Sequence, residues 1–292
     1  MSPFQEATTR YRESLEKGNW RMSDDYIHGY SADEMVRLTR MQDILNTAEL
    51  AALDLGGVRR LLDVGAGLGQ MARALARALE PGGKVVGVER DGRQIAAARR
   101  QADDAGEAGL VEFRAGDATA LPLGDGERGS FDLAHARFLL EHVRDPAAVV
   151  AEMVAAVRPG GRVVLVDDDH ELLTLWPECP MAARAWRIYW ESYRDRGLDP
   201  LVGRRMAGLL RDAGARPTRV TTVFYGASHG MPLFDPVIDN LIGVMDGAAD
   251  GLDRSGRLPR AEVDRAISAL NEWRRSGAAT LWYSLPLAEG VK

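Results

Sequence analysis

The stretch LLDVGAGLGQ, residues 61–70, places three glycines directly after a short apolar run. Residues 59–64 are typical of a buried strand, and a glycine-rich turn after a strand lets the backbone approach a ligand closely. The N-terminus of the helix expected next attracts negative charge. A dinucleotide-binding turn, G-x-G-x-x-G, would need glycine at position 70, but this position is Gln70 and the spacing is G-x-G-x-G. The stretch therefore predicts a nucleotide-binding turn that departs from the dinucleotide pattern.

Short apolar runs continue along the chain and alternate with helical patterns. Strands are expected over residues 59–64, 84–89, 111–116, 131–136, 162–167, 216–226 and 279–287. Asp91 and Asp145 are typical helix N-caps, and Pro146 suits the first helical position. Because the first five strands alternate with helices, we predict an α/β fold with a doubly wound parallel sheet and right-handed crossovers.

An acidic residue stands at the end of the second predicted strand. Glu89 follows Gly67 by 22 residues, the offset at which an acid binds ribose hydroxyls with both carboxylate oxygens. A solvent-exposed acid at a strand end is the alternative interpretation. Together, the turn, the acid and the strand order predict a nucleotide-type cofactor more strongly than the glycines alone.

The composition is that of an ordinary globular protein. The chain has 292 residues, 46% of them hydrophobic and 27% charged, with a formal net charge of -6. This charge argues against broad binding to a nucleic-acid backbone. Cys179 is the single cysteine, so an internal disulfide and a cysteine-based zinc site are excluded. No signal peptide or long apolar run is evident, and we expect a cytoplasmic protein without membrane contact.

Five motifs resemble the class I S-adenosylmethionine-dependent methyltransferases. They are LLDVGAGLGQ, VVGVERD, GDATALPL, SFDLAHARFLLEHVRDP and VRPGGRVVLVDDD. The resemblance is strongest over residues 59–168 and extends over most of 26–225. It indicates the small-molecule branch, which includes ubiquinone and menaquinone methyltransferases and natural-product tailoring enzymes. The resemblance implies a Rossmann-like sheet of seven strands, mostly parallel with an antiparallel last strand.

The same resemblance implies S-adenosylmethionine as cofactor and a set of residues that contact it. Gly65 and Gly67 would pass beneath its methionine part, and Asp117 would accept a hydrogen bond from the adenine amino group. Asp117 as a turn-forming residue is the alternative. The full predicted set is Tyr26, Gly29, Arg37, Gly65, Ala66, Gly67, Gln70, Glu89, Arg90, Gly116, Asp117, Ala118, Ala136 and Arg137.

The expected domain organisation follows the same resemblance. Residues 1–55, with a capping box at Ser31 and Glu34, would form an N-terminal helical lid. Residues 56–292 would form the cofactor-binding domain, within which 170–202 and 235–277 supply cap helices on the substrate side. The first of these segments is rich in aromatic residues, which suit either a cap core or the roof of an acceptor pocket.

Two histidines are candidates for a general base, although an activated methyl donor mainly requires alignment and exclusion of water. His142 lies in LLEHVRDP, near the position where the family binds substrate, and His229 lies in a glycine-containing loop. The alternative for His142 is a structural hydrogen bond to a neighbouring loop. The acidic run 167–171 invites a metal interpretation. Because consecutive strand residues point to opposite faces, this run alone cannot supply three convergent ligands, and we expect no metal.

These observations predict methyl transfer to an oxygen, nitrogen or carbon atom of a small organic acceptor, a secondary metabolite or a quinone-like compound. The alternative is a protein that binds S-adenosylmethionine without methylating, as a scaffold or as a catalyst of another rearrangement. An NAD(P)-dependent reductase is disfavoured by Gln70. The expected partner is the small-molecule acceptor and no nucleic acid, with a homodimer as one option.

Overall fold

The computed structural model describes residues 45–292 and divides into two compact units. One unit, the sheet unit, comprises residues 45–173, 193–225 and 283–292. The other, the helical unit, comprises residues 174–192 and 226–282 among those described. The predicted lid residues Tyr26, Gly29 and Arg37, with the Ser31–Glu34 capping box, lie outside the described residues.

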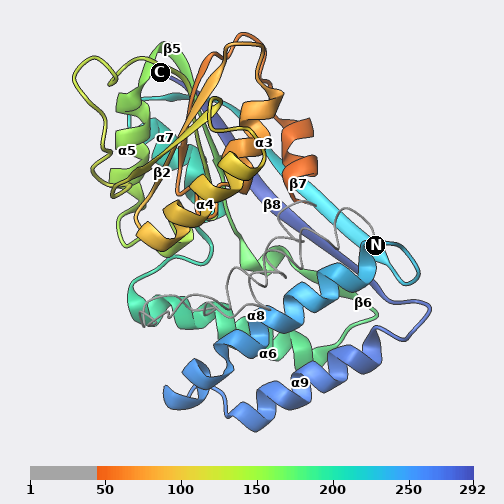
Figure 1. The fold of residues 1–292 in the computed structure, drawn as a ribbon. Helices are drawn as coiled ribbons and strands as arrows, with labels where there is room; N and C mark the ends of the chain where they lie inside the picture. Colours follow the sequence, from red (N-terminus) through yellow and green to blue (C-terminus); the bar gives the residue numbers. More distant parts are fainter. Residues whose placement is uncertain (1–44) are drawn as a thin grey trace. The chain divides into compact units, whose positions relative to one another are not determined.

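The sheet unit has the predicted doubly wound arrangement of strands (Figure 1). Its strands are β1 (Arg60–Val64), β2 (Lys84–Glu89), β3 (Val111–Ala115), β4 (Phe131–Arg137) and β5 (Val157–Val166). It also holds most of β7 (Arg216–Ser228) and β8 (Thr280–Val291), whose remaining residues belong to the helical unit. The order across the sheet is β3-β2-β1-β4-β5-β8. The first five strands pair in parallel, and β8 runs antiparallel to β5. The predicted fold class is confirmed.

Strand register places the predicted site residues at one edge of the sheet. Val64 pairs with Val88 of β2 on one side and with Ala136 of β4 on the other. The residues that follow these three strands therefore lie side by side at the carboxyl edge. In a doubly wound sheet this edge is where ligands bind.

Helices cover both faces of this sheet. They are α3 (Gln70–Ala78), α4 (Gly92–Asp104), α5 (Pro146–Ala156) and α7 (Met206–Asp212). Both predicted N-caps are confirmed, because Asp91 accepts from the backbone of Arg93 and Gln94, and Asp145 accepts from Ala148 at 3.0 Å. Each cap satisfies a backbone donor that the first helical turn leaves unpaired.

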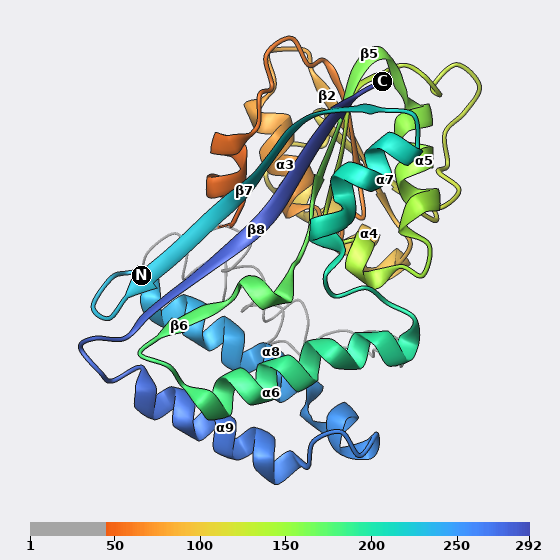
Figure 2. The ribbon, with the colours of Figure 1, turned by 180° about the vertical axis from the view of Figure 1, so that it is seen from behind.

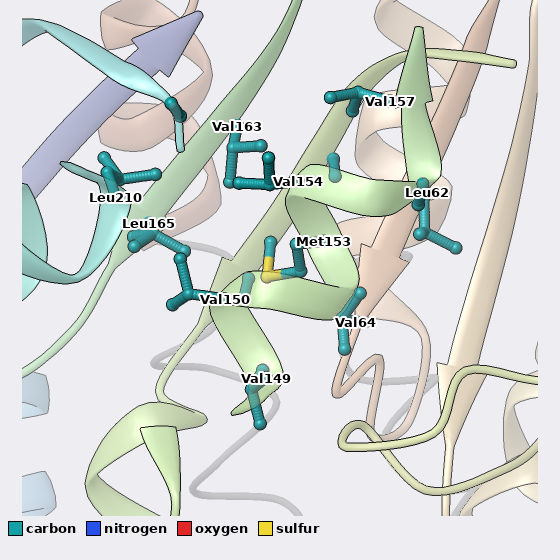
Figure 3. Packing of buried hydrophobic residues seen from close by; sticks show 14 of the residues in the cluster. Leu62, Val64, Val149, Val150, Met153, Val154, Val157, Val163, Leu165 and Leu210 are labelled. Atoms are coloured by element: carbon teal, nitrogen blue, oxygen red, sulfur yellow. The ribbon is translucent and has the colours of Figure 1, made fainter. Parts of the chain in front are cut away.

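Alternate strand residues supply the two cores between the sheet and its helices. Leu62 and Val64 pack with α5 and α7, whereas Leu61 packs with α3 and α4. Figure 3 shows the first core from close by, with Val150 and Met153 of α5 among the strand side chains. All of these side chains are buried, and such burial provides the main driving force for folding.

The helical unit contains the aromatic segment. Its helices are α6 (Pro180–Glu191), α8 (Phe234–Arg254) and α9 (Arg260–Trp273), and each contacts the other two. Tyr189 and Trp190 are buried, and the indole of Trp273 donates to the Pro177 carbonyl at 2.6 Å. The aromatics of α6 therefore serve at least as core. Within residues 45–292, no helix combines the length and apolar character needed to cross a membrane.

Three strands differ from the sequence prediction. Strand β5 begins at Val157, five residues before the predicted start at 162. A three-residue strand, β6 (Thr174–Trp176), pairs with residues 280–282 of β8, and so short a strand carries no detectable periodicity. Strand β8 also extends to Val291, beyond the predicted end at 287. Figure 2 shows β8 alongside β7, its other neighbour.

Candidate functional site

The glycine-rich turn follows β1 and is fastened to the end of β2. The backbone N–H groups of Gly65 and Ala66 both donate to the Val88 carbonyl, at 2.8 and 3.0 Å. Gly65 and Gly67 have φ angles of 77° and 55°, which glycine adopts without steric cost. Gln70 is the first residue of α3. The structure therefore places these predicted residues at the carboxyl edge, next to a helix N-terminus.

The third glycine of the turn is required by packing. Gly69 has φ of 76°, and a Cβ atom there would lie 2.4 Å from Cζ of Phe113 and 2.9 Å from Cβ of Ala98. Both neighbours belong to the core between the sheet and α4. A side chain at this position would push the helix N-terminus away from the sheet.

Glu89 directs its carboxylate at the glycine-rich turn. Oε2 accepts from the backbone N–H of Gly67 at 3.0 Å. Oε1 accepts from the backbone N–H groups of Arg90 and Asp91, at 2.8 and 3.0 Å. These bonds fix the acid at the end of β2, with Oε2 on the turn and Oε1 on the backbone that follows the strand. The structure thus brings the predicted acid and turn together, while the ribose contact remains a prediction.

Asp117 lies beyond the end of β3 and is exposed. Its Oδ1 accepts from the backbone N–H and the hydroxyl of Thr119, at 2.8 and 2.6 Å. These bonds to Thr119, with a smaller effect of the Arg90 charge, lower the pKa of Asp117. Gly116 packs against Pro122, whose Cδ would lie 2.5 Å from an added Cβ. The turn-forming alternative is therefore realised in the structure, and the adenine contact of Asp117 stays a prediction.

The remaining predicted contacts of this edge are largely buried. Ala118 packs against the core beneath the loop, and Ala136 of β4 is 1% exposed. Arg137, the last residue of β4, is also buried. Its guanidinium donates to Glu49 and to Asn46, at 2.7 Å in both cases. Arg137 thus has protein partners on the helical segment 45–52, and its place beside the transferable methyl stays a prediction.

A buried charged cluster surrounds His135, in the middle of β4. Nδ1 of His135 lies 2.7 Å from Asp63, and Nε2 lies 2.6 Å from Glu49. Both ring nitrogens face carboxylate oxygens, and the imidazolium is the form in which both nitrogens donate to them. Burial opposes this charge, but Glu49 and Asp63 raise the pKa of His135 to about 9. The strand pattern over residues 131–136 gives no indication of this charge.

The side chains of the acidic run after β5 point to different neighbours, as expected for consecutive residues at the end of a strand. Asp167 accepts from the backbone N–H groups of Leu139 and Leu140, at 3.0 and 2.7 Å. Asp168 accepts from the Tyr283 hydroxyl. Asp169 accepts from the Arg204 guanidinium at 2.7 Å. Each carboxylate therefore serves a different neighbour.

A second buried cluster nevertheless forms around Glu141, which sequence analysis did not single out. Glu141, Asp168 and His170 each offer a ligand-type atom, and these atoms lie within 4.8 Å of one another. His170 Nε2 is 2.8 Å from Glu141, and Asp168 also bonds to Glu141. Burial and the Glu141 charge raise the pKa of Asp168 to about 7, whereas the two neighbouring histidines lower that of Glu141 to about 2 despite burial.

His142 stands at the edge of this second cluster. It is the last residue of a short 3-10 helix, Leu140–His142, just beyond β4. Its Nε2 lies 3.4 Å from Glu141, and its ring stacks on Tyr193 with centroids 5.9 Å apart. Its side chain keeps 25% of its surface accessible, unlike those of His170 and Glu141. The side chain is therefore both held by buried groups and open to a ligand.

His229 belongs to the helical unit and has structural partners. Its Nδ1 lies 2.9 Å from the Arg274 carbonyl, and its ring meets Phe234 edge-on. Its backbone N–H donates to Ala279 at 2.8 Å. These contacts fix the loop between β7 and α8, so His142 is the better placed of the two predicted bases.

Comparisons with known proteins agree with these features. The methyltransferase domain family matches residues 62–165. An uncharacterized 37.1 kDa protein of transposon TN4556 from Streptomyces fradiae is 37% identical over 238 residues, which cover 80% of this chain and 64% of that protein. This chain thus spans slightly less than two thirds of that relative. O-methyltransferase cnsE of Penicillium expansum is 32% identical over 220 residues, covering 73% of this chain and 74% of the relative.

Solved structures share the fold over nearly the whole chain. The [4+2]-cyclase SpnF has a TM-score of 0.51 and 21% identity, and the match covers 99% of this chain and 96% of SpnF. A geranyl diphosphate C-methyltransferase from Streptomyces coelicolor A3(2), solved with Mg²⁺, geranyl diphosphate and S-adenosyl-L-homocysteine, has a TM-score of 0.51 and 15% identity, with 99% and 98% of the chains covered. One architecture therefore supports different chemistries.

Proposed function

This chain belongs to the methyltransferase domain family, and from that premise we propose that it transfers a methyl group from S-adenosylmethionine to an oxygen, nitrogen or carbon atom of a small organic acceptor. The observation that carries the proposal is the placement of Glu89, whose Oε2 lies 3.0 Å from the Gly67 nitrogen at the carboxyl edge of the sheet. A carboxylate beside a glycine-rich turn can bind the ribose of a cofactor whose methionine part crosses the turn.

The residues at this edge fit such a cofactor by their chemistry. The Glu89 carboxylate can accept hydrogen bonds from two ribose hydroxyls. The left-handed glycines Gly65 and Gly67 present backbone without side chains where the cofactor would cross. When bound, the cofactor supplies an activated methyl group on a sulfonium. The protein's own work is then to align the acceptor, exclude water and accept a proton where the acceptor loses one.

His142 is the proposed general base. It lies beyond the end of β4, two strands from Glu89 in the sheet, and its ring is partly accessible. The neighbouring groups hold this ring in place, as a base requires. The acceptor is a secondary metabolite or quinone-like compound in this proposal.

Cofactor binding and turnover can be tested separately. Calorimetric titration with S-adenosylmethionine and with S-adenosylhomocysteine tests the cofactor. Incubation with isotopically labelled S-adenosylmethionine and a panel of phenols, quinols, amines and carbon acids then tests methyl transfer by mass spectrometry. Lack of cofactor binding would refute the proposal. Tight binding with no labelled product from any acceptor class would favour the alternative, a binding protein or a catalyst of another rearrangement.

Replacing Asp117 by asparagine is expected to weaken S-adenosylmethionine binding only about two- to tenfold, the effect of one neutral hydrogen bond. The asparagine oxygen can still accept from the adenine amino group or from Thr119. Calorimetry with the Asp125→Asn variant, an equivalent change in an exposed loop, provides the control. A loss as large as that of Glu89→Ala would contradict the placement of adenine beside Asp117.

Methyl transfer is expected to be independent of a metal ion. The donor atoms of Glu141, Asp168 and His170 bond directly to one another or to Tyr283, so protons balance their charge. Dialysis against a strong chelator should leave both cofactor affinity and the turnover rate unchanged. A loss of turnover that Mg²⁺ or Zn²⁺ restores would instead identify these three side chains as a metal site.

A further inference from the structure

The carboxylate of Glu141 lies between two imidazole rings. Its Oε2 is 2.8 Å from Nε2 of His170, and its Oε1 is 3.4 Å from Nε2 of His142. Each oxygen therefore faces one histidine. The Glu141 side chain is 4% exposed, so neighbouring protein groups, among them the two histidines and Asp168, supply the hydrogen bonds that its charge requires.

The surroundings of Glu141 keep it ionised. His142 and His170 lower its pKa to about 2 in spite of burial. Asp168, which bonds to Glu141, has its pKa raised to about 7 by burial and by the Glu141 charge. The proton of this acidic pair thus resides on Asp168, and the negative charge resides on Glu141. This is the arrangement in which Glu141 accepts from both rings.

The His142 ring is also fixed from its other sides. It stacks on Tyr193, a fully buried ring, with an interplanar angle of 28°. The backbone before it is held by Asp167, which accepts from Leu139 and Leu140. The titratable groups that face the Glu141–His142 pair from the adjoining elements are Asp167, Asp168, His170, Tyr193 and Tyr283.

We propose that Glu141 is a positioning residue that fixes the tautomer and orientation of His142 for proton abstraction. Glu141 accepts from Nε2–H of His142, which places the lone pair of the neutral ring on Nδ1. The 3.4 Å separation is long for a hydrogen bond, and such contacts commonly tighten when substrate binds. This inference rests on the proposed function, in which His142 is the base.

The proton and electron balance of the step is simple. With the methyl donor bound, Nδ1 of His142 would take the proton of the acceptor, and the acceptor's electron pair would form the new bond to the methyl carbon. The electrons of the broken carbon–sulfur bond would remain on sulfur, so that the products would be a neutral thioether and an imidazolium. The charge lost from the sulfonium therefore reappears on His142, beside Glu141, whose carboxylate stabilises it.

Nitrogen-15 NMR of histidine-labelled full-length protein tests this directly, with S-adenosylhomocysteine present as the probe. In the wild type, we expect neutral His142 to be the Nε2–H tautomer. In Glu141→Gln, the ring loses this carboxylate acceptor, so the Nδ1–H tautomer of neutral His142 should gain population. Glu171→Gln, the same change at a nearby exposed acid, should leave the tautomer unchanged. The His142→Gln spectrum assigns the resonance.

The outcomes separate the inference from the function on which it rests. An Nδ1–H tautomer in the wild type, or an unchanged balance of His142 tautomers in Glu141→Gln, would overturn the role of Glu141 even when the cofactor binds. Failure of the wild type to bind S-adenosylhomocysteine by calorimetry would instead count against the proposed function. If Glu141→Gln does not fold, the wild-type tautomer still decides the question.

Discussion

Replacing Glu89 by alanine is expected to weaken S-adenosylmethionine binding about 10- to 100-fold, the scale of one or two lost charge-assisted hydrogen bonds. The carboxylate stands at the end of β2 with Oε2 bound to the glycine-rich turn. Alanine removes the proposed ribose contact and also releases the Gly67 N–H. Calorimetric titration of the folded variant measures the loss.

Two further variants separate the ribose contact from support of the turn. Glu89→Gln keeps one acceptor oxygen for the turn but removes the charge, so its affinity for S-adenosylmethionine should lie between those of the wild type and of Glu89→Ala. Glu80→Ala, an equivalent change at an exposed acid after α3, should bind the cofactor normally. Unchanged affinity in a folded Glu89→Ala protein would remove the ribose assignment.

The sheet and its family could be predicted because their signals are local. Apolar runs alternating with helices predicted the parallel strands, and Asp91 and Asp145 predicted two helix starts. The resemblance to small-molecule methyltransferases, based on motifs within residues 59–168, is confirmed. The spacing between the glycines and Glu89 predicted that this acid lies beside the turn, because parallel strands end at the same edge of a sheet.

The buried charges could not be predicted, because their partners are distant in sequence. His135 and Glu49 are 86 residues apart, and nothing in the strand pattern of FDLAHA indicates a charged partner. Glu141 lies in the apolar context LLEHV, where an acid is expected to face solvent. Instead, it lies in a buried turn beside His170, 29 residues away. Periodicity reports which face a side chain occupies, not which distant group it meets.

The cluster of Glu49, His135 and Arg137 should make stability depend on pH. The pKa of His135 is about 9 in the folded protein against an ordinary 6.5, so the folded state holds the proton more tightly. The resulting stabilisation is fully present below pH 6.5 and is lost as the pH rises to 9. From this shift, the loss in the free energy of unfolding is on the order of 3 kcal/mol.

Replacing Glu49 by glutamine should test this cluster and is expected to lower the free energy of unfolding at pH 6.5 by about 3–5 kcal/mol. The change leaves the charges of His135 and Arg137 buried without their shared carboxylate. It should also lower the pKa of His135, so the fall in stability between pH 6.5 and 9 should shrink. Urea titrations across this range measure both effects.

The comparison with wild type is necessary because His170 and Asp168 titrate in the same pH range. They are present in both proteins, so the difference between the two stability curves reports on His135. Glu272→Gln, the same change at an exposed helical position, should alter neither the stability nor its pH dependence. Parallel curves for wild type and Glu49→Gln would show that His135 is neutral when folded. The proton would then reside on Glu49 or Asp63, whose carboxyl group would donate to a ring nitrogen across the 2.6 or 2.7 Å contact.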